Sequence, residues 1–184
     1  MSSGPAAEPG AAIDEARARA LVIERQSRLR TSSGRLIAWL VERGMTEEAA
    51  REAMAGLERD GYVDDLAYAV SVARARQGRR SESREALRQR LERLGVRVEA
   101  IDACLAMQSS DLIRAADWLR SNHRAALLAL RDGDGSQETA DESWLRERAT
   151  LLRILRQAER RGFSGSDIFV VLRRWQIDAS RWLG

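Results

Sequence analysis

Residues 87–105 read LRQRLERLGVRVEAIDACL, a stretch in which one glycine separates two segments with helical periodicity. Leu87 and Leu91 stand eight and four residues before Gly95, which is the spacing of one helix face. Ile101 and Leu105 stand six and ten residues after it and form a facing apolar stripe. Glycine adopts the left-handed conformation that ends many helices without a Cβ penalty. The stretch therefore predicts two helices joined at Gly95.

The same pattern occurs twice more in the chain. LIAWLVERGMTEEAAREAM begins at Leu36, and ILRQAERRGFSGSDIFVVL begins at Ile154. Thr46 and Ser164 follow the two glycines by two residues and are predicted to cap the second helix of each pair. The repeat predicts equivalent core positions at minus eight, plus one, plus six and plus ten from the glycines Gly44, Gly95 and Gly162: Leu36, Leu87 and Ile154; Met45, Val96 and Phe163; Ala50, Ile101 and Ile168; Met54, Leu105 and Leu172.

These repeats predict an all-α protein built as an elongated array of three small tandem helical repeats, preceded by an N-terminal helix over 13–29. A third helix is expected after each of the first two pairs, over 64–78 and 111–131. Ile177 and Trp182 are expected to cover the end of the third repeat, which lacks such a helix. The predicted boundaries are a disordered tail over 1–12, the N-terminal helix and first repeat over 13–80, a second repeat over 81–131, an acidic linker over 132–142 and a third repeat over 143–184.

The composition gives little support for an enzyme. The one cysteine, Cys104, is predicted to be a buried small hydrophobe, and the one histidine, His123, is predicted to lie on the surface of a helix. The two residues are far apart in sequence, and no lysine is present for a phosphate-binding loop. We therefore expect no catalytic residue, no metal and no cofactor.

The same sequence favours a cytoplasmic monomer. A single cysteine fits a reducing compartment. The first ten residues lack the basic start and apolar run of a signal peptide. No apolar run is long enough to cross a membrane.

Charge is separated along the chain, although the total is only +3. Residues 46–65 carry seven acids and two arginines, whereas residues 74–97 carry nine arginines and three glutamates. Asp64 and Asp65 are best explained as N-terminal acids of a helix, since capping and the helix dipole favour them there. The arginines exceed what a helix C-terminus requires. Two pairs at a spacing of four, Arg76 with Arg80 and Arg84 with Arg88, are predicted to share helix faces.

The arginines have two interpretations. They form solvated faces, or they contact an anionic partner, either a nucleic acid or an acidic protein surface. Because two basic groups occur in separate repeats at matching helix ends, we favour an anionic partner. The candidate contact residues are Arg74, Arg76, Arg79, Arg80, Arg84, Arg88, Arg153, Arg156, Arg160, Arg161, Arg173 and Arg174.

Four motifs give a family resemblance. ERDGYVDD, SVARARQG, LRQRLERLGV and the closing ILRQAERRGFSGSDIFVVLRR together resemble the RecX family of recombination regulators, from about Thr31 to Trp175. The sequence departs from the family at QGRRSESRE, where members usually carry a shorter glycine- and proline-containing turn, and Tyr68 stands where phenylalanine is usual.

The resemblance implies a regulator that lies in the groove of the RecA–DNA filament and inhibits ATP hydrolysis and strand exchange. Its partners would be the RecA filament and single-stranded or double-stranded DNA, contacted through the arginines named above. The alternative functions are a stand-alone helical nucleic-acid-binding module and a protein-interaction scaffold.

Overall fold

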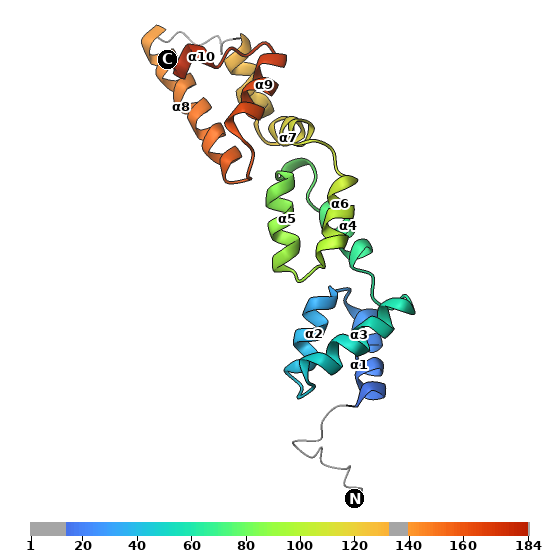
Figure 1. Ribbon diagram of the computed structural model, residues 1–184. Helices are drawn as coiled ribbons and strands as arrows, with labels where there is room; N and C mark the ends of the chain where they lie inside the picture. Colours follow the sequence, from blue (N-terminus) through green and yellow to red (C-terminus); the bar gives the residue numbers. More distant parts are fainter. Residues whose placement is uncertain (1–13, 133–139, 184) are drawn as a thin grey trace, which may run out of the picture. The chain divides into compact units, whose positions relative to one another are not determined.

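A computed structural model describes residues 14–132 and 140–183 of the chain (Figure 1). The described residues are helical and contain no strand, which confirms the predicted all-α class. The elements in chain order are α1 (Glu15–Arg28), α2 (Ser33–Val41), α3 (Glu47–Arg59), α4 (Asp65–Arg74), the 3₁₀ turn η1 (Gly78–Arg80), α5 (Arg84–Arg93), α6 (Val98–Ala106), α7 (Asp111–Asp132), α8 (Ala140–Glu159), α9 (Gly165–Arg174) and α10 (Ser180–Leu183).

The glycine-centred pattern fixes the three helix pairs α2–α3, α5–α6 and α8–α9. The φ angles of Gly44, Gly95 and Gly162 are 93°, 73° and 78°, as a left-handed helix end requires. Thr46 and Ser164 accept hydrogen bonds from the backbone N–H groups of Ala49 and Asp167, so both predicted caps are confirmed. All twelve predicted core positions are buried. The equivalence of the repeats therefore holds in three dimensions.

The described residues divide into two compact units. The first contains residues 14–70 with Leu91–Ala103, and the second contains Ser71–Arg90 with residues 104–132 and 140–183. The division runs through α4, α5 and α6, so the second helix pair contributes residues to both units.

The core of the first unit lies between α1, α2 and α3, which Figure 1 shows grouped together. Helix α1 begins two residues later than the predicted start at residue 13 and packs its small side chains, Ala18 and Val22, against α3. Leu36 and Leu40 of α2 and Leu57 of α3 are fully buried beside them. The N-terminal helix therefore completes the first repeat. The predicted disordered tail over 1–12 lies outside the described residues.

The core of the second unit joins α7 to the third repeat. Trp118 and Leu119 of α7 share one cluster with Ile154 of α8 and Leu172 of α9. Ile177 and Trp182 are buried in the same cluster, as predicted for the end of the chain. Helix α8 begins at Ala140, so part of the predicted acidic linker over 132–142 is helical, and residues 133–139 lie outside the described residues.

The helix predicted over 64–78 is shorter than expected. Asp64 caps it through the N–H of Ala67, as predicted, but α4 ends at Arg74. The N–H of Arg76 then bonds to the carbonyl of Ala73 in a turn, and Gly78, with φ of 57°, opens the 3₁₀ turn η1. The prediction that Arg76 and Arg80 share a helix face is therefore wrong. Arg84 and Arg88 do lie one turn apart in α5.

Asp65 departs from the expected role of a second N-terminal acid. Its carboxylate is buried and accepts hydrogen bonds from the N–H and hydroxyl of Ser33, both at 2.8 Å, and from the N–H of Arg97 at 2.9 Å. The second repeat has Arg97 where the other two have a capping Thr or Ser. Asp65 therefore fixes the start of α2 and the turn before α6 within the first unit.

Candidate functional site

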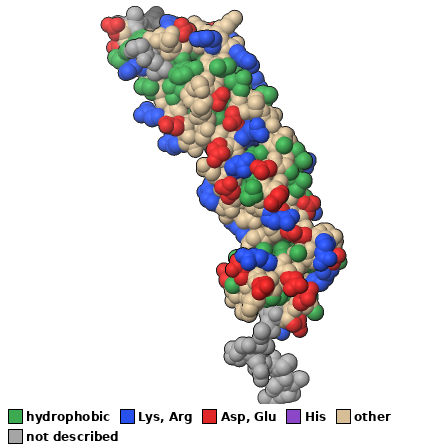
Figure 2. Space-filling model, in the orientation of Figure 1, with side chains coloured by type: hydrophobic (Ala, Val, Ile, Leu, Met, Phe, Trp, Pro, Cys, Tyr) green, Lys and Arg blue, Asp and Glu red, His purple; other side chains and the backbone are tan. Residues whose placement is uncertain are grey.

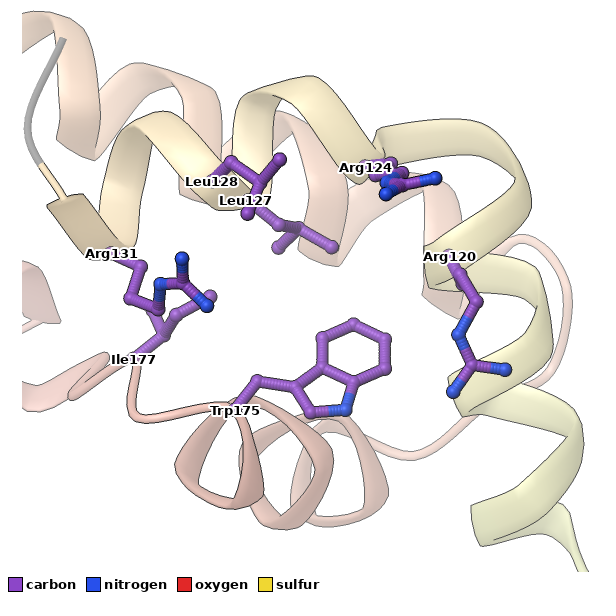
Figure 3. A pocket seen from close by; sticks show the side chains of 7 residues that line it. All are labelled: Arg120, Arg124, Leu127, Leu128, Arg131, Trp175 and Ile177. Atoms are coloured by element: carbon purple, nitrogen blue, oxygen red, sulfur yellow. The ribbon is translucent and has the colours of Figure 1, made fainter.

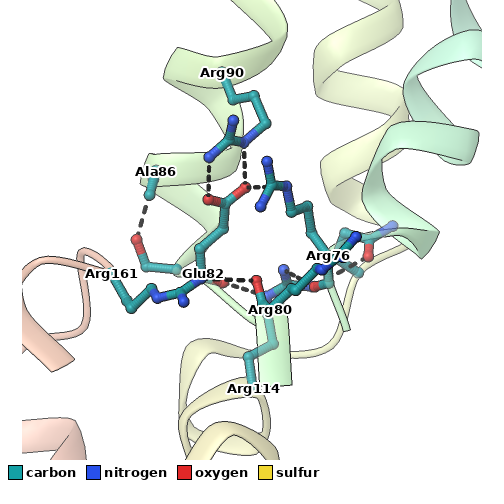
Figure 4. A network of polar contacts seen from close by, with 9 residues as sticks. Arg76, Arg80, Glu82, Ala86, Arg90, Arg114 and Arg161 are labelled. Carbon is teal, nitrogen blue, oxygen red and sulfur yellow. Dashed lines mark hydrogen bonds and ion pairs between the residues drawn. The ribbon is translucent and has the colours of Figure 1, made fainter. Parts of the chain in front are cut away.

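A buried carboxylate lies at the centre of the basic region in the second unit. Glu82 stands between η1 and α5, and its side chain is only 5% exposed. Arg90, two turns along α5, binds it through both carboxylate oxygens, with Nε–Oε1 at 2.8 Å and a second nitrogen to Oε2 at 2.9 Å (Figure 4). Such bidentate geometry is the strong form of an arginine–carboxylate pair. The pair anchors the residues between η1 and α5.

Arg114 supplies a second, deeper cation. This α7 residue is 5% exposed, and its guanidinium donates to the carbonyl oxygens of Glu82 at 2.7 Å and Arg76 at 3.2 Å. Burial lowers the pKa of Arg114, but an arginine remains protonated in a protein. Its hydrogen bonds go to these backbone oxygens and to the side-chain amide oxygen of Gln108 at 3.3 Å, and the acids whose charges act on it are Asp111 and Glu82. Arg114 therefore adds positive charge beneath the segment that carries Arg76 and Glu82.

The third repeat meets this segment through the end of α8. Arg161 accepts a hydrogen bond at its carbonyl from the N–H of Ser83 at 2.9 Å, and its side chain donates to the carbonyl of Arg80 at 3.4 Å. Figure 4 shows the side chain of Arg161 directed to this segment. Two arginines from the basic stretch before residue 97, Arg76 and Arg80, thereby lie close to one from the later stretch.

The resulting cluster holds more cations than its carboxylate balances. Arg76 approaches Glu82 only to 3.9 Å, at the limit of an ion pair. Burial and the neighbouring Arg90 lower the pKa of Arg76, and the attraction of Glu82 does not outweigh them. We define the arginine cluster as Arg76, Arg80, Arg90, Arg114 and Arg161 around Glu82. The cluster as defined holds five cations and one anion, and Asp111 is a second acid beside Arg114, so arginines remain in excess and a phosphate or carboxylate gains favourable contacts there.

Some arginines near the cluster have side chains that are exposed to solvent, unlike the arginines that hold the segment between α4 and α5. Arg79 and Arg80 on η1 have exposed side chains, and Arg160 is exposed beside Arg161. The backbone at Arg79 is fixed, because the side chain of Asn122 donates to its carbonyl at 3.3 Å. The turn therefore presents two side chains from a constrained backbone.

The other predicted contact residues are dispersed. The side chain of Arg84 in α5 donates to the carbonyl of Leu105 in α6 at 3.0 Å, and so links these two helices. Arg88 lies 4.0 Å from Glu85, Arg156 donates to Leu152 of its own helix, and Arg74 is exposed in the last turn of α4. Arg173 and Arg174 end α9 and line a groove with the partly exposed Phe169 and Val170. The structure thus brings together Arg76, Arg80 and Arg161 of the twelve, with Arg79 and Arg160 adjacent in sequence.

Arg153 lies near His123, and there the sequence prediction was wrong. His123 was expected on the surface, but its ring is half-buried against Trp118, with ring centres 4.9 Å apart. Burial lowers the pKa of His123, and the positive charge of Arg153 lowers it further. Cys104, by contrast, is buried as predicted.

Sequence reasoning missed the centre of the arginine cluster. Glu82 and Arg90 are eight residues apart in a basic stretch, and the turn that brings them together has no simple periodic signal. Arg114 did carry a signal: it stands one turn before Trp118 and beside Ala115, on the apolar face of α7. An arginine in a core register is usually held by hydrogen bonds.

The described residues contain no group of His, Cys, Asp and Glu suited to a metal ion. Among the same residues, no helix combines the length and apolar character needed to cross a bilayer. On the face drawn in Figure 2, arginine and acidic side chains are interspersed over the described residues.

Comparison with known proteins then identifies the fold. No protein-family model and no curated protein sequence matches the chain. The solved structures that match include two crystal structures, each aligned over 87% of this chain. One is of the regulatory protein RecX, at 20% identity and a TM-score of 0.62 over 71% of that chain. The other is of RecX from Lactobacillus salivarius, at 13% identity and a TM-score of 0.58 over 95% of that chain. The protein therefore has the fold of the RecX structures.

Proposed function

We propose that this protein is a RecX-type regulator that binds the RecA–DNA filament and inhibits RecA's ATP hydrolysis and strand exchange during recombination and DNA repair. One observation carries the proposal: the arginine cluster gathers residues from all three predicted repeats in a chain that has the fold of RecX structures. Three of the motifs that resemble the family contain Arg76, Arg90 and Arg161 of the cluster, whereas Arg80 and Glu82 lie in QGRRSESRE, where the sequence departs from the family.

We infer different roles for the arginine cluster and for the η1 turn beside it. Glu82, Arg90 and Arg114 hold the segment between α4 and α5, and η1 presents Arg79 and Arg80 to a partner. Guanidinium groups suit phosphate oxygens of DNA and carboxylates of a protein equally well. A filament of protein on DNA offers both kinds of anion. Binding through this surface is the step on which the inhibition depends.

The test is the single-stranded-DNA-dependent ATPase of RecA from the same organism. The parent protein, added below the RecA concentration, is expected to slow ATP hydrolysis. The double variant Arg79→Ala/Arg80→Ala removes two exposed side chains, whereas the carbonyls that hold the turn remain. It is expected to inhibit less. Arg59→Ala, an exposed arginine at the end of α3 in the first unit, is the matched control. Unchanged ATPase at every ratio of parent to RecA would contradict the proposal.

Binding to bare DNA separates this function from a stand-alone nucleic-acid-binding module. At one fixed salt concentration, a filament regulator is expected to bind RecA-coated single strands more tightly than the same strands alone. Equal affinity for both would favour the nucleic-acid module. Binding to neither would favour a scaffold for another protein.

A further inference from the structure

A second basic site lies in the same unit, apart from the arginine cluster. A cavity of about 140 Å³ opens between α7 and the end of α9. It is lined by Arg120, Arg124, Leu127, Leu128, Arg131, Trp175 and Ile177 (Figure 3). None of these residues belongs to the arginine cluster, and the proposed function gives them no role.

The cavity combines an apolar floor with cations. Leu127 and Ile177 are buried and Trp175 is half-buried, whereas Leu128, which also lines the cavity, is 41% exposed. Figure 3 shows Arg120 and Arg131 at opposite ends of the cavity, with the two leucines and Trp175 between them. The lining residues include no acid. A ligand that fits must therefore be apolar in the middle and negatively charged toward its ends.

The arginines are available for such a ligand. Arg131 pairs with the adjacent Asp132, and Arg120 lies 3.3 Å from Asp117, but all four side chains are substantially exposed. Exposed pairs of this kind contribute little and are readily exchanged for another carboxylate. Arg124 makes no ion pair or hydrogen bond within the described part of the chain. Among residues 14–132 and 140–183, no acid is thus paired with this cation, which lies beside an exposed leucine.

We propose that this cavity binds a short acidic peptide segment of a partner protein, with one large apolar side chain on the floor and carboxylates on either side. Arg120 and Arg131 are eleven residues apart on one helix, a separation of about 16 Å at 1.5 Å per residue. An extended peptide spans that distance in about five residues. The expected ligand therefore has acids about four residues apart with a large apolar residue between them.

A peptide suits the cavity better than a nucleobase. Arg120 already lies over the ring of Trp175, with its guanidinium carbon 5.7 Å from the ring centre, so that aromatic surface is partly covered. The rest of the floor is aliphatic, whereas single-stranded nucleic acids use open aromatic platforms for stacking. Aliphatic and aromatic side chains of a peptide can make apolar contacts with the leucines of the floor.

The test uses a fluorescein-labelled peptide, Glu-Ala-Phe-Ala-Glu, with both ends blocked, and fluorescence anisotropy with the full chain. Arg124→Glu reverses the cation that lacks a partner and is expected to weaken binding about tenfold or more. Leu128→Ser, which changes the floor without changing charge, is expected to weaken it as well. Arg59→Glu makes the same charge change in the first unit and is expected to leave binding within about twofold, since it lies outside the cavity. Circular dichroism checks that each variant is folded.

Three results would overturn the proposal. Equal binding by the parent and by folded Arg124→Glu and Leu128→Ser places the peptide elsewhere. Displacement of the peptide by an oligothymidylate that itself requires Arg124 and Leu128 makes the cavity a nucleic-acid site. Replacing phenylalanine by serine in the peptide must abolish binding, because charge alone would otherwise account for it. None of these measurements depends on RecA, so they are independent of the proposed function.

Discussion

The N–H of Ser83 donates to the carbonyl oxygen of Arg161 at 2.9 Å, which joins the start of α5 to the glycine turn after α8. An equivalent contact exists in the first unit, where the N–H of Gly34 donates to the carbonyl of Gly95 at 3.1 Å and the Ser32 hydroxyl donates to Leu94. In both places the beginning of one helix pair's first helix abuts the glycine turn of the next pair. The glycine turns at 95 and 162 are therefore contact points between repeats as well as helix ends.

This contact predicts that Gly162→Ala is more destabilising than Gly44→Ala. Both substitutions place a Cβ at positive φ, which costs about 1–2 kcal/mol. A Cβ on Gly44 meets nothing within 4 Å, whereas on Gly162 it lies 2.5 Å from the Ser83 hydroxyl and 3.0 Å from the Cβ of Ala86. Urea unfolding is expected to show an additional loss of about 1–3 kcal/mol for Gly162→Ala.

The partner of that clash can be tested directly. Ser83 also caps α5 through the N–H of Ala86, so Ser83→Ala destabilises the parent. In the Gly162→Ala background, Ser83→Ala relieves the closest contact and is expected to cost less than in the parent. Additive effects of the two substitutions would contradict the contact.

The repeat alignment predicts the cost of two core truncations. Leu87, eight residues before Gly95, is fully buried, and Leu105, ten residues after it, is 4% exposed. Replacing either by alanine is expected to lower the free energy of unfolding by about 2–5 kcal/mol. Val98→Ala, at an exposed position of α6, is the control and is expected to change stability by less than about 0.5 kcal/mol. Near-neutral effects at both leucines would show that the core assignment is wrong.

The buried carboxylate predicts different roles for two nearby arginines. Arg90→Ala removes both hydrogen bonds to the Glu82 side chain and leaves only Arg76, at 3.9 Å. Because an uncompensated buried charge is unfavourable, this change is expected to cost about 1–4 kcal/mol in thermal or urea unfolding at neutral pH. Arg79→Ala, on the exposed face of η1, is expected to leave stability nearly unchanged. If Arg90→Ala is equally neutral, Glu82 is not held as described.

The sequence predicted most of the fold and only part of the candidate site, for physical reasons. Apolar positions recur at the same spacing around Gly44, Gly95 and Gly162, because each helix pair must bury an equivalent face. The core residues could therefore be predicted from their spacing in the sequence. The arginine cluster depends on the end of α4, and nothing local to Arg74 requires the helix to stop there. The contact of Ser83 with Arg161 joins residues about eighty positions apart. Such long-range contacts have no signature in one sequence.

His123 predicts a pH dependence of stability. Burial beside Trp118 and the charge of Arg153 lower its pKa below the ordinary value of 6.5, so the folded state binds a proton less readily than the unfolded chain. The resulting loss of stability is absent well above the pKa that His123 has in the unfolded chain. It grows as the pH falls through that value toward the lower pKa of His123 in the folded protein. Stability is therefore expected to decrease from pH 7 to pH 5.

Nuclear magnetic resonance can measure this titration without ambiguity, because His123 is the only histidine in the chain. Its ring resonance is expected to titrate below pH 6.5, and His123→Gln is expected to remove part of the stability loss. A midpoint at or above 6.5 would show that the ring is not buried beside Trp118.

The exposed arginines of η1 predict how binding to a RecA filament depends on salt. If Arg79 and Arg80 contact DNA phosphates, each releases condensed counterions, and each contributes about 0.7 to the slope of log affinity against log salt on a single strand. The variant Arg79→Ala/Arg80→Ala is therefore expected to bind more weakly at low salt and to have a slope smaller by about 1.4. Arg76 is left unchanged because its backbone carbonyl and side chain both take part in the arginine cluster. Anisotropy of labelled filaments at four or more salt concentrations gives both quantities. Weaker binding with an unchanged slope would assign these arginines to carboxylates of the partner protein, and unchanged affinity would make η1 a solvated turn.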